Sequence, residues 1–377
     1  MIKIDEAIRN EVQSIFEHLH ENPEISWEEV NTTKFIEEKL SFMNFDVETF
    51  SDCTGLVATI GSGNPVVAIR ADIDALWQEV NGSYQANHSC GHDAHTAIVL
   101  GVAMLLQNNI SNLTGTIKLI FQPAEEKGTG ALKMIEKGAV NDVDYLYGIH
   151  LRPIQELEHG AASAGISHGA GTLLTGRIIG DDTHGARPHL GTNIIEVGAE
   201  IVQKLNHIHV NPMVPHSVKI TSFIADGGSL NIIPGSADFS IDIRSQTNEV
   251  MTELNTSVQE IIDNITSFYK LKYSLEKATY FPAAIIDSEA KEHLKTAISN
   301  VLGSENTLDT ILTTGGDDFH FYKIKNPEIK AIMLGLGCDL KPGLHHADMS
   351  FNHDSLINGV YILYEAIKNT MSNPSIS

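Results

Sequence analysis

Apolar segments that end in polar, metal-ligating side chains recur along the chain and constrain its fold more than any other feature. Residues 66–70, 116–122 and 145–150 each have the length and composition of a buried strand. In open α/β sheets, ligand and catalytic groups collect just past the carboxyl ends of the strands. Buried acids are costly without partners, so the repeated pattern favours a metal centre over packing. The polar residues at these ends are Asp72, Asp74, Glu125, Glu126 and His150.

The most concentrated set of ligand types is the octapeptide HSCGHDAH at residues 88–95. Cys90 and His92 are two residues apart, which lets both side chains point into one site from an extended segment or a tight turn. Residues 96–106 are typical of a buried helix, so we expect the cluster on a loop at a helix N-terminus, where a thiolate is stabilised. Thiolate and imidazole are good ligands for borderline-soft divalent metals. A histidine-rich surface loop is the alternative.

The adjacent carboxylates of Glu125 and Glu126 suit metal-assisted hydrolysis. One glutamate can ligate a metal while its neighbour takes a proton from the attacking water. The alternative is a solvated first turn of a helix over residues 129–137, because acids are favoured at helix N-termini. Asp72 and Asp74 could likewise be ordinary turn formers if they are considered alone.

The charge balance and composition exclude several classes of partner. The 377 residues include 48 acidic and 25 basic side chains, a formal net charge of −23, which argues against binding nucleic acid or an anionic membrane. The longest apolar run, residues 97–106, is about half of what a membrane span needs. The start is an amphipathic helix pattern without an apolar signal region, and three distant cysteines imply no disulfide framework. We therefore expect a cytoplasmic protein.

From residue 172 the pattern changes to that of a separate α+β domain. The β-α-β-β-α-β order is typical of helices packed on one face of a sheet. We expect this domain, residues 172–286, to be inserted into a catalytic domain formed by residues 1–171 and 287–377. The expected strands are residues 173–180, 217–225, 237–244 and 271–279, and the expected helices are residues 193–208 and 248–269.

Six ordered motifs give the chain a resemblance to a known family. CGHDAH, FQPAEE, YGIH, THGARPH, LNIIP and GLHH resemble, in this order, the dinuclear-metal amidohydrolases and peptidases. This group includes hippurate hydrolases, N-acyl-amino-acid amidohydrolases, auxin-conjugate hydrolases and aminobenzoyl-glutamate hydrolases. The resemblance covers essentially the whole chain. It implies an α/β fold with a metallo-aminopeptidase-like mixed sheet flanked by helices, and an inserted ferredoxin-like lid or dimerisation domain.

The resemblance also implies roles for individual residues. Glu125 would be the general base and acid, and Asp74 would orient a ligand. His184 would reach the substrate carbonyl, often from the partner subunit, while Asn231 and Arg244 would hold the amino-acid part of the substrate. Two divalent metal ions would bind per subunit, bridged by the Cys90 thiolate. The implied ligands are Cys90, His92, Glu126, His150 and His345.

The implied reaction is hydrolysis of the amide bond of N-acetyl or N-aroyl amino acids. The ligand set favours zinc, cobalt or nickel, whereas the family often works with manganese, so zinc and manganese are the leading candidates. A dipeptidase or carboxypeptidase with the same centre is an alternative. A non-catalytic amino-acid or metal-binding protein is a further one, although binding alone needs only one of Glu125 and Glu126. A homodimer through the inserted domain is also implied.

The chain departs from the family pattern in several places. The family reads D-A-L-P-I-x-E after its first strand, whereas residues 76–79 read LWQE and lack the proline. Residues 180–183, GDDT, place extra negative charge before the lid histidine. The usual H-x-P reads HHA here, which makes His346 a rival of His345 as ligand. His345 is favoured because it follows the glycine-leucine pair. His20 is a further possible ligand, but a lone histidine at a helix end is more typical of capping or packing.

Overall fold

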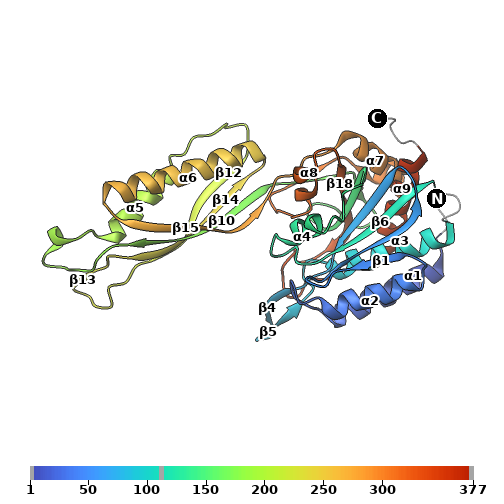
Figure 1. Ribbon diagram of the computed structural model, residues 1–377, viewed down its shortest axis with the longest axis horizontal. Coiled ribbons are helices and arrows are strands. Elements are labelled where there is room, and N and C mark those ends of the chain that lie inside the picture. Colours follow the sequence, from blue (N-terminus) through green and yellow to red (C-terminus); the bar gives the residue numbers. More distant parts are fainter. Residues whose placement is uncertain (1–3, 110–113, 373–377) are drawn as a thin grey trace. The chain divides into compact units, whose positions relative to one another are not determined.

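The computed structural model describes residues 4–109 and 114–372, and the chain forms two compact units (Figure 1). One unit comprises residues 1–167, 285–312 and 318–377, and the other comprises residues 168–284 and 313–317. Residues 373–377, expected to be a frayed end, lie outside the described residues. Within the described residues, no helix is both long and apolar enough to cross a membrane.

The first unit is built on an eight-stranded mixed sheet with the strand order β1-β2-β6-β3-β7-β18-β8-β16. The four strands β6, β3, β7 and β18 run parallel to one another, while β1 and β2 pair antiparallel at one side. This sheet confirms the predicted α/β class. The strand bounds are β1 (Asp46–Thr49), β2 (Leu56–Ser62), β3 (Val66–Asp72), β6 (Gly115–Gln122), β7 (Tyr145–Pro153), β8 (Ala162–Ser163), β16 (Thr307–Leu308) and β18 (Lys330–Leu340).

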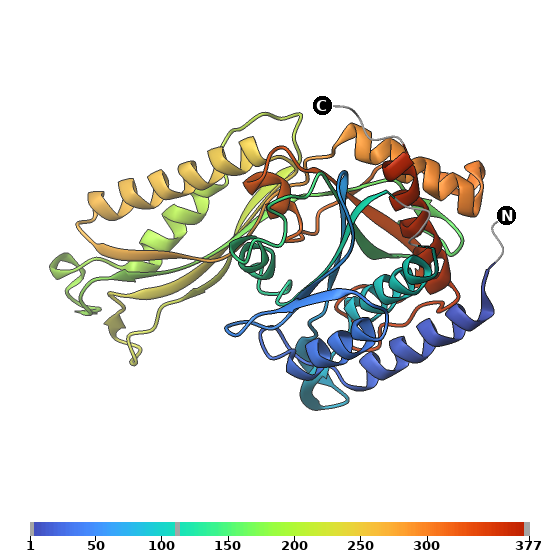
Figure 2. The ribbon, with the colours of Figure 1, turned by 45° about the vertical axis from the view of Figure 1, so that its right-hand side comes forward.

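Helices pack against this sheet and against each other, as the turned view in Figure 2 shows. Helix α3 is almost wholly buried because it contacts α1, α9 and strand β3. Helix α1 buries the apolar stripe of Ile8, Val12, Ile15, Phe16 and Leu19 at helical spacing. The helix bounds are α1 (Glu6–Glu21), α2 (Val30–Ser41), α3 (His92–Asn109), α4 (Gly130–Glu136), α7 (Ser288–Leu302), α8 (His320–Lys325) and α9 (Ser355–Ser372).

Helix α3 begins earlier than the sequence predicts. It starts at His92 rather than near residue 96, so His92, Asp93 and His95 lie in its first turns and not on a loop. The polar start is stable there because each of these side chains has a partner elsewhere in the fold, and Asp93 also accepts the N–H of Ala94. Of the two predicted ligands Cys90 and His92, only Cys90 precedes the helix.

A short hairpin between β3 and α3 was not predicted. It pairs β4 (Leu76–Val80) with β5 (Ser83–Asn87) through the turn Asn81-Gly82. Both turn residues have positive φ, 52° and 83°, the geometry that Asn-Gly favours in two-residue hairpins. The Asn-Gly pair was therefore a readable signal of this hairpin.

The second unit is an antiparallel four-stranded sheet with the order β12-β14-β10-β15. Helices α5 and α6 contact each other and the sheet, and alternate residues of β14 are buried. The arrangement confirms the predicted β-α-β-β-α-β order. The bounds are β10 (Ala170–Ile179), α5 (Ile194–Leu205), β12 (His216–Ile224), β14 (Ala237–Ser245), α6 (Asn248–Phe268) and β15 (Lys272–Phe281), with a small ladder of β11 (Thr183–His184) and β13 (Ile232–Ile233).

Candidate metal centre

Cys90 and His150 meet at the carboxyl-terminal side of the parallel strands. Cys90 lies between β5 and α3, and its Sγ is 3.6 Å from Nε2 of His150 on β7. Nδ1 of His150 donates to the carbonyl of Leu151 at 2.7 Å, which turns Nε2 toward the thiol. Burial lowers the pKa of His150 well below its ordinary value, so the ring is neutral and can act as a ligand.

His92 turns one ring nitrogen toward a group of carboxylates. Its Nδ1 donates to the backbone carbonyl of Asp74 at 2.9 Å, which fixes the tautomer. Its buried Nε2 has no hydrogen-bond partner among the described residues and lies 3.9 Å from both Glu125 Oε2 and Glu126 Oε1. Burial opposes a charge on His92, but nearby Asp72 helps to raise its pKa well above the ordinary value. The surroundings therefore favour a positive charge at this point.

Asp74 holds the two glutamates and His92 together. Its carboxylate accepts the backbone N–H groups of Glu125 and Glu126, each at 3.1 Å, and the hydroxyl of Ser26 at 2.6 Å. Burial disfavours its ionisation, but the hydrogen bonds from His92 and Ser26 bring the pKa of Asp74 below its usual value. The predicted orienting role of Asp74 thus has a geometric basis.

Glu126 joins His345 to the same cluster. Glu126 Oε1 lies 3.5 Å from Nε2 of His345 and, like His92 Nε2, is buried without a hydrogen-bond partner in the described part of the chain. Burial raises the pKa of Glu126 to about 7. The rival His346 is exposed, and its Nδ1 accepts the N–H of Asp348 within its own loop. The structure therefore places His345, and not His346, beside the other predicted ligands.

These side chains fit divalent metal ions. Cys90, His92 and His150 have ligand atoms within 4.8 Å of one another, and so do Cys90, Glu126 and His345. The two groups share Cys90, so one cysteine sulfur is within reach of both. A thiol, imidazoles and a carboxylate match the ligands of zinc-like metals. Two buried polar atoms of the group, His92 Nε2 and Glu126 Oε1, lack a hydrogen-bond partner among the described residues.

A buried ion network that the sequence interpretation missed lies beneath this centre. Arg70 on β3 is fully buried and donates to Asp72 at 2.5 Å and to Asp318 at 2.8 Å. Gln122 accepts from Arg70 at 2.9 Å and donates to Asp318 at 2.8 Å. A charged residue inside an apolar strand needs buried partners, so Arg70 was the available signal.

Glu29 supports the backbone just before the glutamate pair. Its carboxylate accepts the N–H of Ala124 at 2.9 Å and the hydroxyl of Thr54 at 2.6 Å. Ala124 has a φ of 51°, a left-handed conformation that a residue other than glycine adopts only when its surroundings hold it there. Glu29 therefore contributes to the positions of Glu125 and Glu126.

The three predicted substrate-contacting residues belong to the second unit. His184 and Asn231 lie together, because Asn231 immediately precedes β13, which pairs with β11, and its carbonyl accepts the N–H of Gly185 at 2.7 Å. The exposed His184 ring accepts the N–H of Ala186 at Nδ1, so a neutral ring carries its proton on Nε2. Arg244 lies on β14, where its Nε donates to Asp242 at 2.7 Å.

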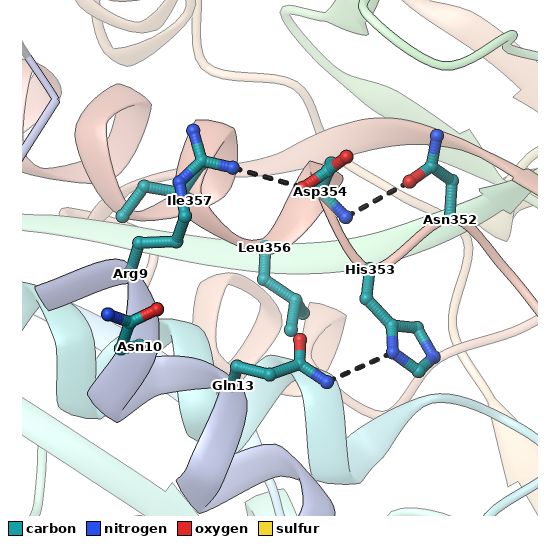
Figure 3. A pocket seen from close by; sticks show the side chains of 8 residues that line it. All are labelled: Arg9, Asn10, Gln13, Asn352, His353, Asp354, Leu356 and Ile357. Atoms are coloured by element: carbon teal, nitrogen blue, oxygen red, sulfur yellow. Dashed lines mark hydrogen bonds and ion pairs between the residues drawn. The ribbon is translucent and has the colours of Figure 1, made fainter. Parts of the chain in front are cut away.

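A hollow of about 350 Å³ in the first unit contains none of the predicted site residues (Figure 3). It lies between α1 and the start of α9, and its polar side chains bond to one another. Arg9 donates to Asp354 at 3.0 Å, and Gln13 lies 3.1 Å from His353 Nδ1. These contacts connect helix α1 to the segment just before helix α9.

Comparison with known proteins decides the family. Residues 68–369 match Peptidase family M20/M25/M40, and this match spans most of the chain. The chain belongs to this family. As a member of a family of amidohydrolases and peptidases, it is a metal-binding hydrolase.

Named relatives of this M20 protein include amide hydrolases. The N-acetyl-L-cysteine deacetylase of Bacillus subtilis (strain 168) is 31% identical over 97% of this chain and 90% of the relative. The IAA-amino acid hydrolase ILR1-like 4 of Arabidopsis thaliana is 30% identical over 81% of this chain and 72% of the relative. The fold matches the YXEP protein of Bacillus subtilis, described as a dinuclear metal-binding M20 peptidase, with a TM-score of 0.81, 28% identity and coverage of 98% and 99% of the two chains.

Proposed function

We propose that this M20 protein cleaves the amide bond of N-acetyl or N-aroyl amino acids with a metal-activated water. The observation that carries the proposal is the position of Glu125 and Glu126. Asp74 accepts both backbone N–H groups, and both carboxylates lie 3.9 Å from Nε2 of His92, which has no hydrogen-bond partner in the described part of the chain. One glutamate can then ligate a metal while the other handles a proton. A protein that only binds metal needs no such pair.

We assign the proton transfers to Glu125. Two bound divalent ions would polarise the attacking water and the carbonyl oxygen of the substrate. Glu125 accepts the proton of the attacking water and delivers it to the departing amine nitrogen, a contribution on the order of 10²–10⁴ in rate. Its 6% exposure keeps competing water away from the carboxylate. Cys90, His92, Glu126, His150 and His345 would hold the ions, with zinc or manganese first and cobalt or nickel next.

We assign the substrate contacts to the second unit. The Nε2 proton of His184 is suited to donate a hydrogen bond to the developing oxyanion. Arg244, oriented by Asp242, would pair with the carboxylate of the amino-acid part, and Asn231 would add a polar contact. These roles agree with the names of relatives that act on acylated or conjugated amino acids.

A homodimer through the second unit is part of the proposal. Strand β12 lies at the edge of its sheet and carries exposed Ile224, and helix α5 exposes Ile195 and Val202. An open strand edge with apolar neighbours is suited to pair with a second copy. Light scattering during gel filtration would show a dimer, and a fully active monomer would contradict this part of the proposal.

A dipeptidase is the second candidate because of the acids beside His184. Asp181 and Asp182 precede β11, and Asp182 accepts the N–H of Gly235 at 2.8 Å, which leaves the exposed Asp181 to pair with a free α-amino group. An N-acyl amino acid lacks that group, so the two substrate classes differ at one chemical point.

Release of free amino acid from a substrate panel separates these functions. Protein stripped of metal and reconstituted with zinc or manganese is given N-acetyl and N-benzoyl amino acids and the corresponding dipeptides. We expect metal-dependent release from the acylated substrates and slower release from dipeptides. Faster release from dipeptides would favour the peptidase, and tight metal binding without any turnover would contradict both.

A further inference from the structure

His345 is the most exposed of the proposed metal ligands, with 56% of its side chain accessible. It also has a φ of 64°, a left-handed backbone conformation that is costly for a histidine. Its loop follows β18 and must nevertheless hold Nε2 near Glu126. The position of His345 therefore depends on what binds its backbone.

Two hydrogen bonds hold that backbone from the β4–β5 side. The N–H of His345 donates to the carbonyl of Ser89 at 2.7 Å, and its carbonyl accepts from Nε2 of Gln78 at 3.3 Å. The hydroxyl of Ser89 donates to Oε1 of Gln78, which closes a ring of three residues. Gln78 thus binds the carbonyl of His345 directly, and it binds Ser89, which in turn accepts the N–H of His345. Ser89 immediately precedes Cys90, so these bonds link the His345 backbone to the segment that carries Cys90.

The neighbouring hairpin strand strengthens the same contact. Nδ2 of Asn87 on β5 lies 3.3 Å from Gln78 Oε1 and donates to the carbonyl of Ala347 at 3.0 Å. Residues 345–347 are thus held at both ends by amide side chains of the hairpin. The amide orientation of Gln78 is determined, because the carbonyl of His345 can only accept.

We propose that Gln78 is a positioning residue for His345. It sets the affinity with which the site formed by His345, Glu126 and Cys90 would bind a metal ion. The inference rests on the proposed metal centre. It depends on the amide of this side chain, because an aliphatic side chain at residue 78 could not form these hydrogen bonds. Gln78 does not touch the reacting atoms, so its effect passes through His345.

Two variants of Gln78 and one matched control test the proposal. Gln78→Leu removes every side-chain hydrogen bond, whereas Gln78→Glu keeps the acceptors for Ser89 and Asn87 but loses the donor to His345. Gln85→Leu is the control, because Gln85 lies directly opposite Gln78 in the hairpin, is exposed, and shows no side-chain hydrogen bond among residues 4–109 and 114–372.

The measurement is equilibrium dialysis of metal-free protein against zinc, with metal analysis of the bound fraction. The unmodified protein should bind two ions, and both Gln78 variants should bind one of them about 10- to 100-fold more weakly, as for other groups that orient ligands. His345→Ala should weaken the binding of the same ion, and Gln85→Leu should bind both ions with the affinity of the unmodified protein. Melting temperatures of the metal-free forms should agree, because the effect concerns the ligand and not the fold.

Opposite results are distinguishable. Unchanged affinity for both ions in the two Gln78 variants would overturn the role of Gln78 and leave the metal centre intact. An unmodified protein that binds no zinc would contradict the metal centre itself and, with it, this inference. If Gln78→Leu fails to fold, Gln78→Glu decides the question, because it keeps the size of the side chain and two of its contacts.

Discussion

Asp72 Oδ1 lies 2.7 Å from Nδ1 of His95, and this contact determines what His95 can do. The other ring nitrogen of His95 accepts the N–H of Leu151 at 3.0 Å, so neither nitrogen is available to a metal. The carbonyl of the same Leu151 accepts from His150. Although His95 belongs to the ligand-rich octapeptide, its role is to hold the backbone of Leu151, the residue whose carbonyl orients His150.

The Asp72 carboxylate should be important for stability because it neutralises buried Arg70. Asp72→Asn leaves Arg70 with one carboxylate partner fewer in a fully buried site, and removing one partner of a buried pair typically costs roughly 3–5 kcal/mol. Urea unfolding of metal-free protein measures the change in free energy. The control is Asp354→Asn, which breaks the exposed pair with Arg9 and should cost about 0–1 kcal/mol. Equal losses in both variants would contradict the buried network.

Glu29 should make stability fall as the pH rises from about 4.5 to 7. Burial raises its pKa to about 7, so in this range the folded state holds a proton that the unfolded chain has lost. Glu29→Gln keeps an acceptor for Ala124 but cannot ionise. The free energy of unfolding of Glu29→Gln should therefore increase relative to that of the unmodified protein as the pH rises, by up to roughly 3 kcal/mol. A difference that stays constant between pH 4.5 and 8 would show that Glu29 does not titrate as stated.

Cys90 should give a spectroscopic signature in cobalt-loaded protein. A thiolate bound to cobalt produces a charge-transfer absorption in the near ultraviolet, and Cys90 is the only cysteine of the described residues that lies in a candidate ligand group. Cys90→Ser should abolish the band. Cys53→Ser should keep it, because Cys53 lies outside these groups. A band that survives in Cys90→Ser would contradict the thiolate ligand.

His184 should act across the proposed dimer. His184→Ala should lower the catalytic rate by about 10²–10³, the usual loss on removing one oxyanion donor. When inactive His184→Ala and Glu125→Gln proteins are mixed and allowed to exchange subunits, activity should return, because one mixed site contains both intact residues. No recovery after demonstrated exchange would place His184 and Glu125 of one subunit in the same site.

Local patterns predicted most of the fold. The helices and strands of the second unit begin and end within a few residues of their predicted positions, because each shows a clear hydrophobic period. The predicted start of α3 was wrong because the first turn of this helix lacks a hydrophobic period. Its first turn is polar, and it is stable only because His92 and His95 bind Asp74 and Asp72 from another part of the chain.

The predicted ligands came together in the structure, but their supports could not be read from the sequence. Arg70 and Asp318 are 248 residues apart, so no local pattern connects them. The role of Gln78 was not predicted, because its contact with His345 depends on how two segments far apart in the sequence meet. Sequence motifs indicate which side chains carry chemistry, whereas the groups that orient them are set by tertiary contacts.

The role of Glu125 in proton transfer is tested most directly by the rate of amide hydrolysis of Glu125→Gln, with its metal content measured in the same sample. We expect the variant to keep both metal ions and to release free amino acid from N-acetyl substrates about 10²–10⁴ times more slowly. Glu21→Gln, at an exposed glutamate of α1, serves as the control and should keep full activity. A fully metal-loaded Glu125→Gln protein that hydrolyses the substrate at the unmodified rate would contradict the central claim.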